Sequence, residues 1–346
     1  MLRCHFLVGQ EKMGKMGNRN NILISSAGRR VSLVRLFQSA VKELGIDAKV
    51  GVTDISQFAP TNYIADLAWS VPRVSSENFI PSLLDLCIAN NIGLVVPTID
   101  TELGKLSENR ELFLENGINL LVCDDDLNRI CFDKRETQQF FEMNNIPVPR
   151  CYTESEIESI ATEDFPLLIK PSKGSSGIGV TIVSNKYELE FFQNYLDEPI
   201  IQEKLNGEEY TIDLLFDFSN TLLCAVPRLR IETRAGEVSK AITVRDEALL
   251  GAVYDVASKL KGARSCVTLQ GFRLENGEFR FIEINPRFGG GFPITAAAGA
   301  NYPKWILQMH MGTLKSKTMQ QEWKDGLLML RYDDEIVIEK QELRHD

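Results

Sequence analysis

The stretch F-I-E-I-N-P-R-F, residues 281–288, decides how the rest of the chain is interpreted. Its apolar residues favour a strand, and on an extended backbone Glu283 and Asn285 leave the same face. A carboxylate beside an amide oxygen suits a hard cation such as Mg²⁺. Pro286 ends the strand, and Arg287 adds a fixed positive charge, a combination that a triphosphate needs around its transferring phosphoryl group. The alternative is an edge strand with a solvated glutamate and an Asn-Pro turn.

A hairpin signal lies directly before this stretch. Strands are predicted over residues 265–274 and 278–284, and the residues between them include Asn-Gly, a pair that favours a tight turn. Pairing of these strands would set Gln270 and Glu283 on neighbouring strands that face one site. The sequence therefore places Gln270 beside the candidate cation site.

Length and charge limit the functions that the chain can have. At 346 residues it should hold two or three domains with their own cores. A content of 44% hydrophobic and 25% charged residues is typical of a soluble globular protein. No apolar run approaches the ~18 residues of a membrane span. The net charge of −10 argues against a general nucleic-acid binder, so we expect neither membrane nor nucleic acid as a partner.

Cysteine and histidine usage narrows the chemistry further. The seven cysteines form no C-x-x-C pair and suggest neither disulfides nor a zinc site, which is typical of cytoplasmic proteins. Only three histidines are present, His5, His310 and His345, and two of them lie in the terminal tails. Hydrolysis by a triad with a histidine base is therefore nearly excluded. Catalysis would have to use carboxylates, Lys, Arg, a metal or a cofactor.

The N-terminal third alternates predicted strands with helices. Strands over residues 21–26, 49–54, 94–97 and 119–123 predict a parallel sheet of Rossmann type. The motif G-x-G-x-x-G does not occur in this region, so dinucleotide binding is unsupported. Ligands of such sheets bind at the carboxyl ends of the strands. That end would carry polar residues whose alternative role is in caps and turns: Ser26, Gly28, Arg29, Asp54, Asp100 and Glu102.

Two segments further along the chain could receive anions. The loop over residues 172–179, S-K-G-S-S-G-I-G, joins two predicted strands next to Lys170, and its backbone can approach a phosphate closely. It is not a Walker A loop, because no Lys-Ser or Lys-Thr follows its last glycine. A flexible hairpin without function is the alternative. Five cations between Arg228 and Arg245 form either a basic surface loop or a site for an anionic substrate.

Taken together, these and further strings resemble the ATP-grasp superfamily, most closely stand-alone proteins like one synthetase half of the carbamoyl-phosphate synthase large subunit. They occur in the family's order over about residues 125–312: Lys134 at a helix start, L-I-K-P with Lys170, S-K-G-S-S-G-I-G-V, I-I-Q-E-K-L, G-E-E-Y-T-I-D, L-Q-G-F and F-I-E-I-N-P-R. The strands before residue 125 resemble the domain that precedes ATP-grasp folds.

The resemblance implies an α/β chain in which a Rossmann-like pre-ATP-grasp domain precedes a two-lobed α+β ATP-grasp domain. The expected segments are, in chain order: 1–19, a disordered leader or expression-vector remnant; 20–125, the pre-ATP-grasp domain; 126–312, the ATP-grasp domain, with a small lobe over about 126–200 and a large lobe over about 201–312; and 313–346, a strand-containing tail.

The resemblance also implies a role for individual residues. The phosphates of ATP would be held by Lys134, Lys170 and Lys173 and covered by Ser175, Ser176 and Gly177. The adenine hinge, with backbone groups reading the base, would be Gln202, Glu203, Lys204 and Leu205. The ribose hydroxyls would bind Glu209, and Mg²⁺ would bind Gln270, Glu283 and Asn285. The transferring phosphoryl group would be stabilised by Arg287, and the acceptor would face Arg228, Lys240 and Arg245.

The chain departs from members of the family in three ways. Gln270 stands where many members carry an acid, although carbamoyl-phosphate synthases resemble the chain here. The second synthetase half of a full-length carbamoyl-phosphate synthase is missing, and the extra C-terminal lobe of biotin carboxylases has no clear counterpart.

The function that the resemblance implies is an ATP-dependent ligase that uses one or two Mg²⁺ ions, or Mn²⁺, to activate a carboxylate as an acyl phosphate. An amine or a thiol then displaces the phosphate. One alternative is phosphorylation of bicarbonate or carbamate, and another is an ATP-binding regulatory module without catalysis. The expected partners are small-molecule carboxylate and amine substrates and, as is common among similar proteins, a second copy in a homodimer. The expected compartment is the cytoplasm.

Overall fold

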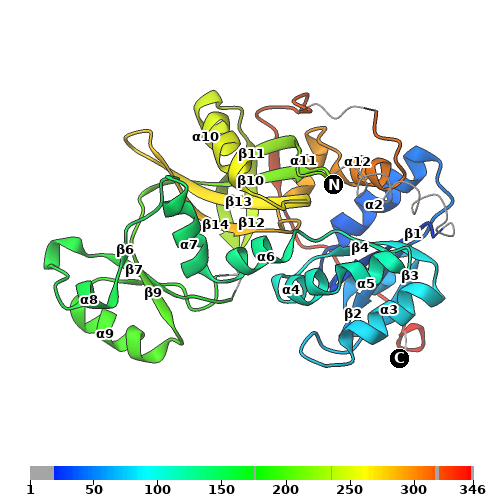
Figure 1. Ribbon diagram of the computed structural model, residues 1–346, viewed down its shortest axis with the longest axis horizontal. Helices are drawn as coiled ribbons and strands as arrows, with labels where there is room; N and C mark the ends of the chain where they lie inside the picture. Colours follow the sequence, from blue (N-terminus) through cyan, green and yellow to red (C-terminus); the bar gives the residue numbers. More distant parts are fainter. Residues whose placement is uncertain (1–18, 175–176, 235, 316–318, 344–346) are drawn as a thin grey trace, which may run out of the picture. The chain divides into compact units, whose positions relative to one another are not determined.

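The computed structural model describes residues 19–174, 177–234, 236–315 and 319–343. The chain divides into two compact units, and Figure 1 colours it from the N-terminus to the C-terminus. Of the described residues, the first unit takes in 19–122, 303–315 and 334–343, and the second takes in 123–174, 177–234, 236–302 and 319–333. None of the helices in the described ranges is long and apolar enough to cross a membrane.

The first unit is built on a parallel sheet of five strands in the order β3-β2-β1-β4-β5. Its strands are β1 (Asn21–Ser25), β2 (Val50–Asp54), β3 (Leu67–Ser70), β4 (Ile92–Pro97) and β5 (Asn119–Leu120). Helices α2 (Val31–Leu44), α3 (Phe79–Ala89), α4 (Asp100–Glu108) and α5 (Arg110–Glu115) lie between them in sequence. The predicted parallel sheet is confirmed. The sequence did not indicate β3, because its L-A-W-S segment is only partly buried at the sheet edge.

Polar side chains gather at the carboxyl ends of β1 and β4. The buried Glu102 carboxylate accepts hydrogen bonds from the Thr98 N–H (2.9 Å), the Ile99 N–H (3.3 Å) and the Ser26 hydroxyl (2.9 Å). Burial raises the pKa of Glu102, and these hydrogen bonds lower it in part. Glu102 therefore caps the start of α4 and fixes the turn after β1, a structural role for this end of the sheet.

A four-stranded antiparallel sheet in the order β6-β9-β7-β8 belongs to the second unit. Its strands are β6 (Cys151–Tyr152), β7 (Leu167–Pro171), β8 (Thr181–Val183) and β9 (Pro199–Glu203), and α8 (Glu154–Ile157) and α9 (Lys186–Tyr195) follow β6 and β8. Apolar residues of the sheet and of α9 form its core. The predicted hairpin around the glycine-rich loop is confirmed, because Leu167 pairs with Val183 and Ile169 pairs with Thr181.

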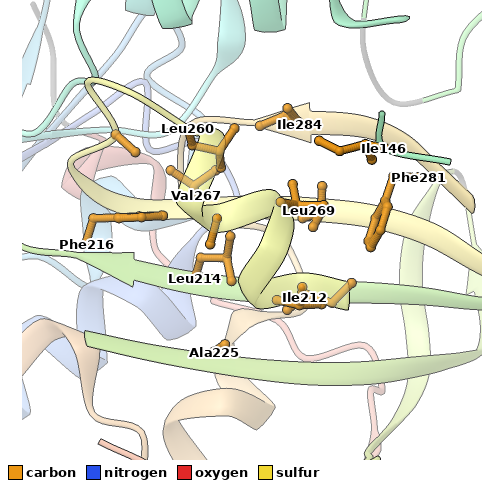
Figure 2. Close-up of a cluster of buried hydrophobic side chains, with 14 of the residues drawn as sticks. Ile146, Ile212, Leu214, Phe216, Ala225, Leu260, Val267, Leu269, Phe281 and Ile284 are labelled. Atoms are coloured by element: carbon orange, nitrogen blue, oxygen red, sulfur yellow. The ribbon is translucent and has the colours of Figure 1, made fainter. Parts of the chain in front are cut away.

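The larger sheet of the second unit has six strands in the order β14-β13-β10-β11-β12-β15, with antiparallel neighbours. The strands are β10 (Gly207–Phe216), β11 (Leu222–Arg234), β12 (Glu237–Thr243), β13 (Ser265–Leu274), β14 (Phe279–Asn285) and β15 (Leu328–Leu330). One face is apolar and packs against α6 (Asp125–Phe132), α7 (Lys134–Met143) and α10 (Glu247–Lys259). Figure 2 shows Leu269, Phe281 and Ile284 in this core.

The opposite face of the larger sheet carries polar side chains among buried apolar ones and is called the polar face below, and an ion pair lies buried in it. Arg228 on β11 donates to Asp213 on β10 through Nε (2.8 Å to Oδ2) and Nη2 (3.0 Å to Oδ1), and both side chains are buried. The Thr295 hydroxyl, from α11 (Phe292–Ala297), donates to the same carboxylate. The Tyr302 hydroxyl donates to the Asp213 carbonyl at 2.8 Å. Each charge compensates the other, which is what permits their burial.

The segment that begins at residue 319 adds β15 to the edge of β12 and is held there by side chains. Arg245 donates to the carbonyls of Gln321 and Trp323, each at 2.7 Å, and its guanidinium lies 3.9 Å from the centroid of the Trp323 ring. The Thr243 hydroxyl donates to the Lys324 carbonyl at 2.8 Å. A cation–π contact and three hydrogen bonds therefore fix the segment to the sheet.

We predict that replacing one member of the buried ion pair destabilises the protein more than replacing both. Arg228→Met leaves the Asp213 carboxylate buried without its cation, and we expect the free energy of unfolding to fall by about 3–5 kcal/mol. The double variant Asp213→Leu/Arg228→Met removes both charges and should lie closer to wild type. Urea denaturation measures both. The same cycle on the exposed pair Arg234–Asp333 is the control and should show no measurable coupling. A double variant less stable than Arg228→Met would contradict the prediction.

Candidate active site

The register of three neighbouring strands brings the predicted metal ligands side by side. Gln270 on β13 lies opposite Glu283 on β14 and opposite Thr211 on β10. Two residues along, Thr268 lies opposite Asn285. These positions alternate with core residues, so their side chains share the polar face of the sheet. The predicted hairpin between β13 and β14 is confirmed, and it fixes this register.

Arg287 lies against this group immediately after β14. Its Nη2 donates to the side-chain oxygen of Asn285 at 3.0 Å, and its backbone carbonyl accepts from the Thr268 hydroxyl at 2.9 Å. The Arg287 N–H also donates to the Asn285 carbonyl at 2.8 Å, so the chain turns back on itself here. Asn285 is only 5% exposed. A cation therefore lies beside the Asn285 amide oxygen, two residues along β14 from Glu283.

A buried lysine from the smaller sheet lies within electrostatic reach of these oxygens. Lys170 on β7 is 7% exposed. Burial lowers the pKa of Lys170, the negative charge of Glu283 opposes this effect, and the positive charge of Lys134 adds to it. Lys134 begins α7, where its N–H donates to the Ser172 carbonyl (2.9 Å) and its ammonium donates to the Gly174 carbonyl (2.7 Å). Two lysines therefore lie at the start of the glycine-rich loop.

A second carboxylate of the polar face belongs to Glu209 on β10. It accepts a hydrogen bond from Arg230 on β11. Burial raises the pKa of Glu209, Arg230 lowers it, and the nearby charge of Glu283 raises it. Arg230 is one of the five cations that the sequence predicts in either a basic surface loop or a site for an anionic substrate, but its contact with Glu209 was not predicted. The string R-L-R puts Arg230 on the same strand face as Arg228.

The predicted adenine hinge lies at the end of β9. The Gln202 side chain is buried and donates to the Cys151 sulfur at 3.0 Å, and Glu203 pairs with Arg280 of β14. Lys204 and Leu205 follow, and both are partly buried. Because the side chains of the first two hinge residues are engaged within the protein, a base bound here would meet backbone groups.

Two parts of the chain match known protein families. Residues 22–121 match the PylC-like N-terminal domain, and residues 131–291 match the ATP-grasp domain. The chain carries an ATP-grasp domain. The resemblance and the α/β fold class predicted from the sequence are thereby confirmed.

Individual relatives agree with this assignment at low identity. The chain is 22% identical over 253 residues to the carbamoyl phosphate synthase large chain of Methanobrevibacter smithii, covering 66% of this chain and 24% of that protein. It is 27% identical over 165 residues to a D-alanine–D-alanine ligase of Fusobacterium nucleatum, covering 45% of this chain and 56% of that protein. The chain thus spans less than two thirds of either relative.

A solved structure shares the fold. The biotin carboxylase domain of 2-oxoglutarate carboxylase from Hydrogenobacter thermophilus, in complex with MgADP, ADP and bicarbonate, is similar with a TM-score of 0.71 at 20% identity. The similarity covers 89% of this chain and 73% of that one. At this identity the likeness establishes the arrangement of strands and helices, and the chemistry has to be argued from the residues.

The glycine-rich loop of the ATP-grasp domain is described in part. Gly177 has a φ of +70°, a conformation that glycine adopts without strain, and its carbonyl accepts the Val180 N–H at 3.2 Å. Lys173 pairs with Glu198 at 3.2 Å on the surface. Two other residues predicted to cover the phosphates, Ser175 and Ser176, lie outside the described residues.

The three remaining cations that we predict to face the acceptor each have an acidic or aromatic partner. Arg228 lies in the buried pair described above. Lys240 pairs with Glu232 on the surface at 2.6 Å, and Arg245 stacks on Trp323. Their role toward an acceptor stays a prediction. An acceptor bound by these cations would either leave the three contacts in place or compete with them.

Removing the buried charge at Lys170 should stabilise the ligand-free protein. Burial lowers the pKa of Lys170 below its ordinary value of 10.5, so Lys170→Met should raise Tm at pH 7 in differential scanning calorimetry. The sign of the pH dependence follows from linkage. The free-energy cost of burying the charged Lys170 ammonium is complete below the folded-state pKa and decreases as pH rises toward 10.5. The Tm difference between Lys170→Met and wild type should therefore shrink with rising pH. Lys186→Met, at an exposed position of α9, is the control and should leave Tm unchanged. A lower Tm for Lys170→Met at pH 7 would contradict the prediction.

Proposed function

We propose that this protein is an ATP- and Mg²⁺-dependent ligase that activates a carboxylate as an acyl phosphate for attack by an amine or a thiol. The observation that carries the proposal is the buried Lys170 near Glu283, with Gln270 and Asn285 in register and Arg287 against Asn285. Cations near an oxygen-rich donor set match the needs of a metal–triphosphate.

The donor set fits a hard divalent cation. Glu283 offers a carboxylate, and Gln270 and Asn285 offer amide oxygens from adjacent strands. Mg²⁺ prefers oxygen ligands, and Mn²⁺ accepts them as well, so either ion suits the site. When bound, Mg–ATP would supply the phosphoryl group together with the metal charge that neutralises it. The count of one or two ions belongs to the same proposal.

The chain's own residues would then hold and orient the reactants. Lys134 and Lys170 would bind phosphate oxygens, and the charge of the phosphates would compensate the burial of Lys170. Arg287 would stand at the transferring phosphoryl group, and Glu209 would accept the ribose hydroxyls while it keeps its contact with Arg230. None of these roles needs a covalent intermediate on the protein.

A second candidate function is phosphorylation of bicarbonate or carbamate. Gln270, an amide where many family members carry an acid, favours it, as does the match to a carbamoyl phosphate synthase over 66% of this chain. The name of the other relative, D-alanine–D-alanine ligase, describes the joining of a carboxylate to an amine and favours the leading proposal. On either reading we expect small-molecule substrates, a homodimer and a cytoplasmic enzyme.

The proposal is tested by nucleotide binding followed by a substrate screen. We expect isothermal titration to show Mg–ATP binding, because cations lie near the oxygen donors. A panel of amino acids and small carboxylic acids, tested in pairs with amines, should contain a combination that stimulates ADP release. Stimulation by bicarbonate alone would favour the second candidate. If the folded protein bound no nucleotide, both enzymatic proposals would fail.

Arg287→Ala separates phosphoryl transfer from nucleotide binding. Loss of a preorganised donor at the reacting group costs about 10²–10³-fold in kcat, so we expect a decrease of that size in ADP release. The Kd for Mg–ATP should change little. Arg129→Ala, at an exposed arginine of α6, is the matched control and should keep wild-type turnover. Unchanged turnover of Arg287→Ala would show that the proposed role of Arg287 is wrong.

A further inference from the structure

Three consecutive glycines follow Arg287 and Phe288, and two other arginines contact the turn that they form. Residues 289–291 lead into α11. Arg228 reaches this turn from β11, and Arg331 reaches it from the position directly after β15. Residue 331 lies beyond the ATP-grasp match, which ends at residue 291. The turn is therefore held partly by a segment outside the family domain.

The turn packs directly onto the Arg228 guanidinium. A Cβ atom at Gly291 would lie 2.2 Å from Arg228 Nη1 and 2.6 Å from Val238 Cγ1. The backbone at position 291 therefore lies so close to these two side chains that only glycine, which has no Cβ, fits there. Arg228 is buried, and its Nη1 has no hydrogen-bond partner among the described residues, although Nε and Nη2 are bonded to Asp213. A buried donor without an acceptor is costly, which is the situation expected where a ligand supplies the acceptor.

The backbone of the turn offers further donors. The N–H groups of Gly289, Gly290 and Gly291 have no acceptor among the hydrogen bonds of the described residues. Successive backbone N–H groups in a turn form a concave site that binds anions. Arg287 lies two residues before Gly289, so an anion held at the turn would be next to the proposed position of the transferring phosphoryl group.

Arg331 fixes the direction of one of these N–H groups. Its Nη1 donates to Glu237 at 3.0 Å, its Nη2 donates to the Gly290 carbonyl, and its own N–H donates to the Ser239 carbonyl at 2.9 Å. In a planar trans peptide, the C=O of Gly290 and the N–H of Gly291 point in opposite directions. Because Arg331 holds the carbonyl, the Gly291 N–H is directed to the side of the turn away from Arg331.

We propose that Arg331 is a positioning residue: by holding the Gly290 carbonyl it orients the backbone N–H groups of residues 289–291 for an oxyanion of the phosphate type beside Arg287. The anion is the phosphoryl group in transfer or the acyl phosphate, so the inference rests on the proposed function. Glu237 and Asp213 compensate the charges of Arg331 and Arg228, which keeps both guanidinium groups at the turn when no anion is bound. Arg331 acts through the Gly290–Gly291 peptide and need not touch the anion.

The position of Arg331 makes the inference testable without unfolding the protein. Its pair with Glu237 is about one-third exposed on both sides, and such pairs contribute little to stability. Arg331→Met should therefore fold and should bind MgADP as wild type does. The Arg331→Met variant should lose the fixed orientation of the turn. The affinity for MgADP does not depend on that orientation, so it should not change.

Orthovanadate, a tetrahedral oxyanion, is the probe. It is titrated into the full-length protein saturated with MgADP. We expect Arg331→Met to bind orthovanadate about tenfold more weakly or worse, with its MgADP affinity within twofold of wild type. Arg331→Lys keeps the charge but cannot span both acceptors, so an intermediate affinity is expected. Arg234→Met removes an exposed arginine that pairs with Asp333 of the same C-terminal segment, and it should match wild type in both titrations.

Each other outcome overturns a distinct claim. If wild type and both Arg331 variants bound orthovanadate equally, the positioning role of Arg331 would be wrong. If wild type bound MgADP but no orthovanadate, the oxyanion site at the turn would be wrong. In both cases the proposed ligase would stand. If wild type bound no MgADP, the proposed function would fail and the inference with it. If Arg331→Met did not fold, Arg331→Lys would decide, and wild-type orthovanadate affinity in that variant would overturn the positioning role.

Discussion

Two opposite charges buried between adjacent strands set the arrangement of the larger sheet. Neither Asp213 nor Arg228 could be buried alone without a large loss of stability, so β10 and β11 are restricted to a register that brings them together. The Asp213 carboxylate also accepts from Thr295, and the Asp213 carbonyl accepts from Tyr302, the first residue of α12 (Tyr302–His310). These bonds tie α11 and Tyr302 to the polar face. The apolar face has no such directional requirement, since cores tolerate repacking if volume and pattern are kept. The polar face therefore determines which alignment of strands is native.

The polar face also explains why the candidate site carries a stability cost. Lys170 is buried near Glu283, and the half-buried Glu209 lies near both Arg230 and Glu283, so charged groups have been drawn partly or wholly out of water into one region. Burial alone would favour the neutral form of each group. An arrangement of this kind is stabilising only when a further charged species completes it. A metal–triphosphate has both signs of charge that the region requires, cationic for Glu283 and anionic for Lys170.

The sequence predicted those parts of the site that depend on local rules. The two-residue spacing of Glu283 and Asn285 and the Asn-Gly turn before them were sufficient to place Gln270 opposite Glu283, because strand alternation and a tight hairpin leave little freedom. The partner of Arg228 could not be found in this way, since Asp213 lies fifteen residues earlier and the pairing of β10 with β11 contains a register shift. The sequence likewise could not predict that Arg228 is buried and Lys240 is exposed, because a cluster of cations along the chain does not indicate which of them lies inside the protein.

Arg331 shows what remains hidden when a site is assembled from distant segments. It reaches the turn after Arg287 only because β15 pairs with β12, and that pairing joins residues almost ninety positions apart, as between Met329 and Ala241. The ATP-handling candidates, from Lys134 to Arg287, all lie inside residues 131–291, whereas Arg331 lies outside them. Within the second unit, the family domain thus provides the candidate machinery for the nucleotide, and the C-terminal segment shapes the turn beside it. Because this segment lies outside the shared domain, the turn beside Arg287 can differ between this chain and its relatives while the nucleotide-binding candidates inside the domain stay the same.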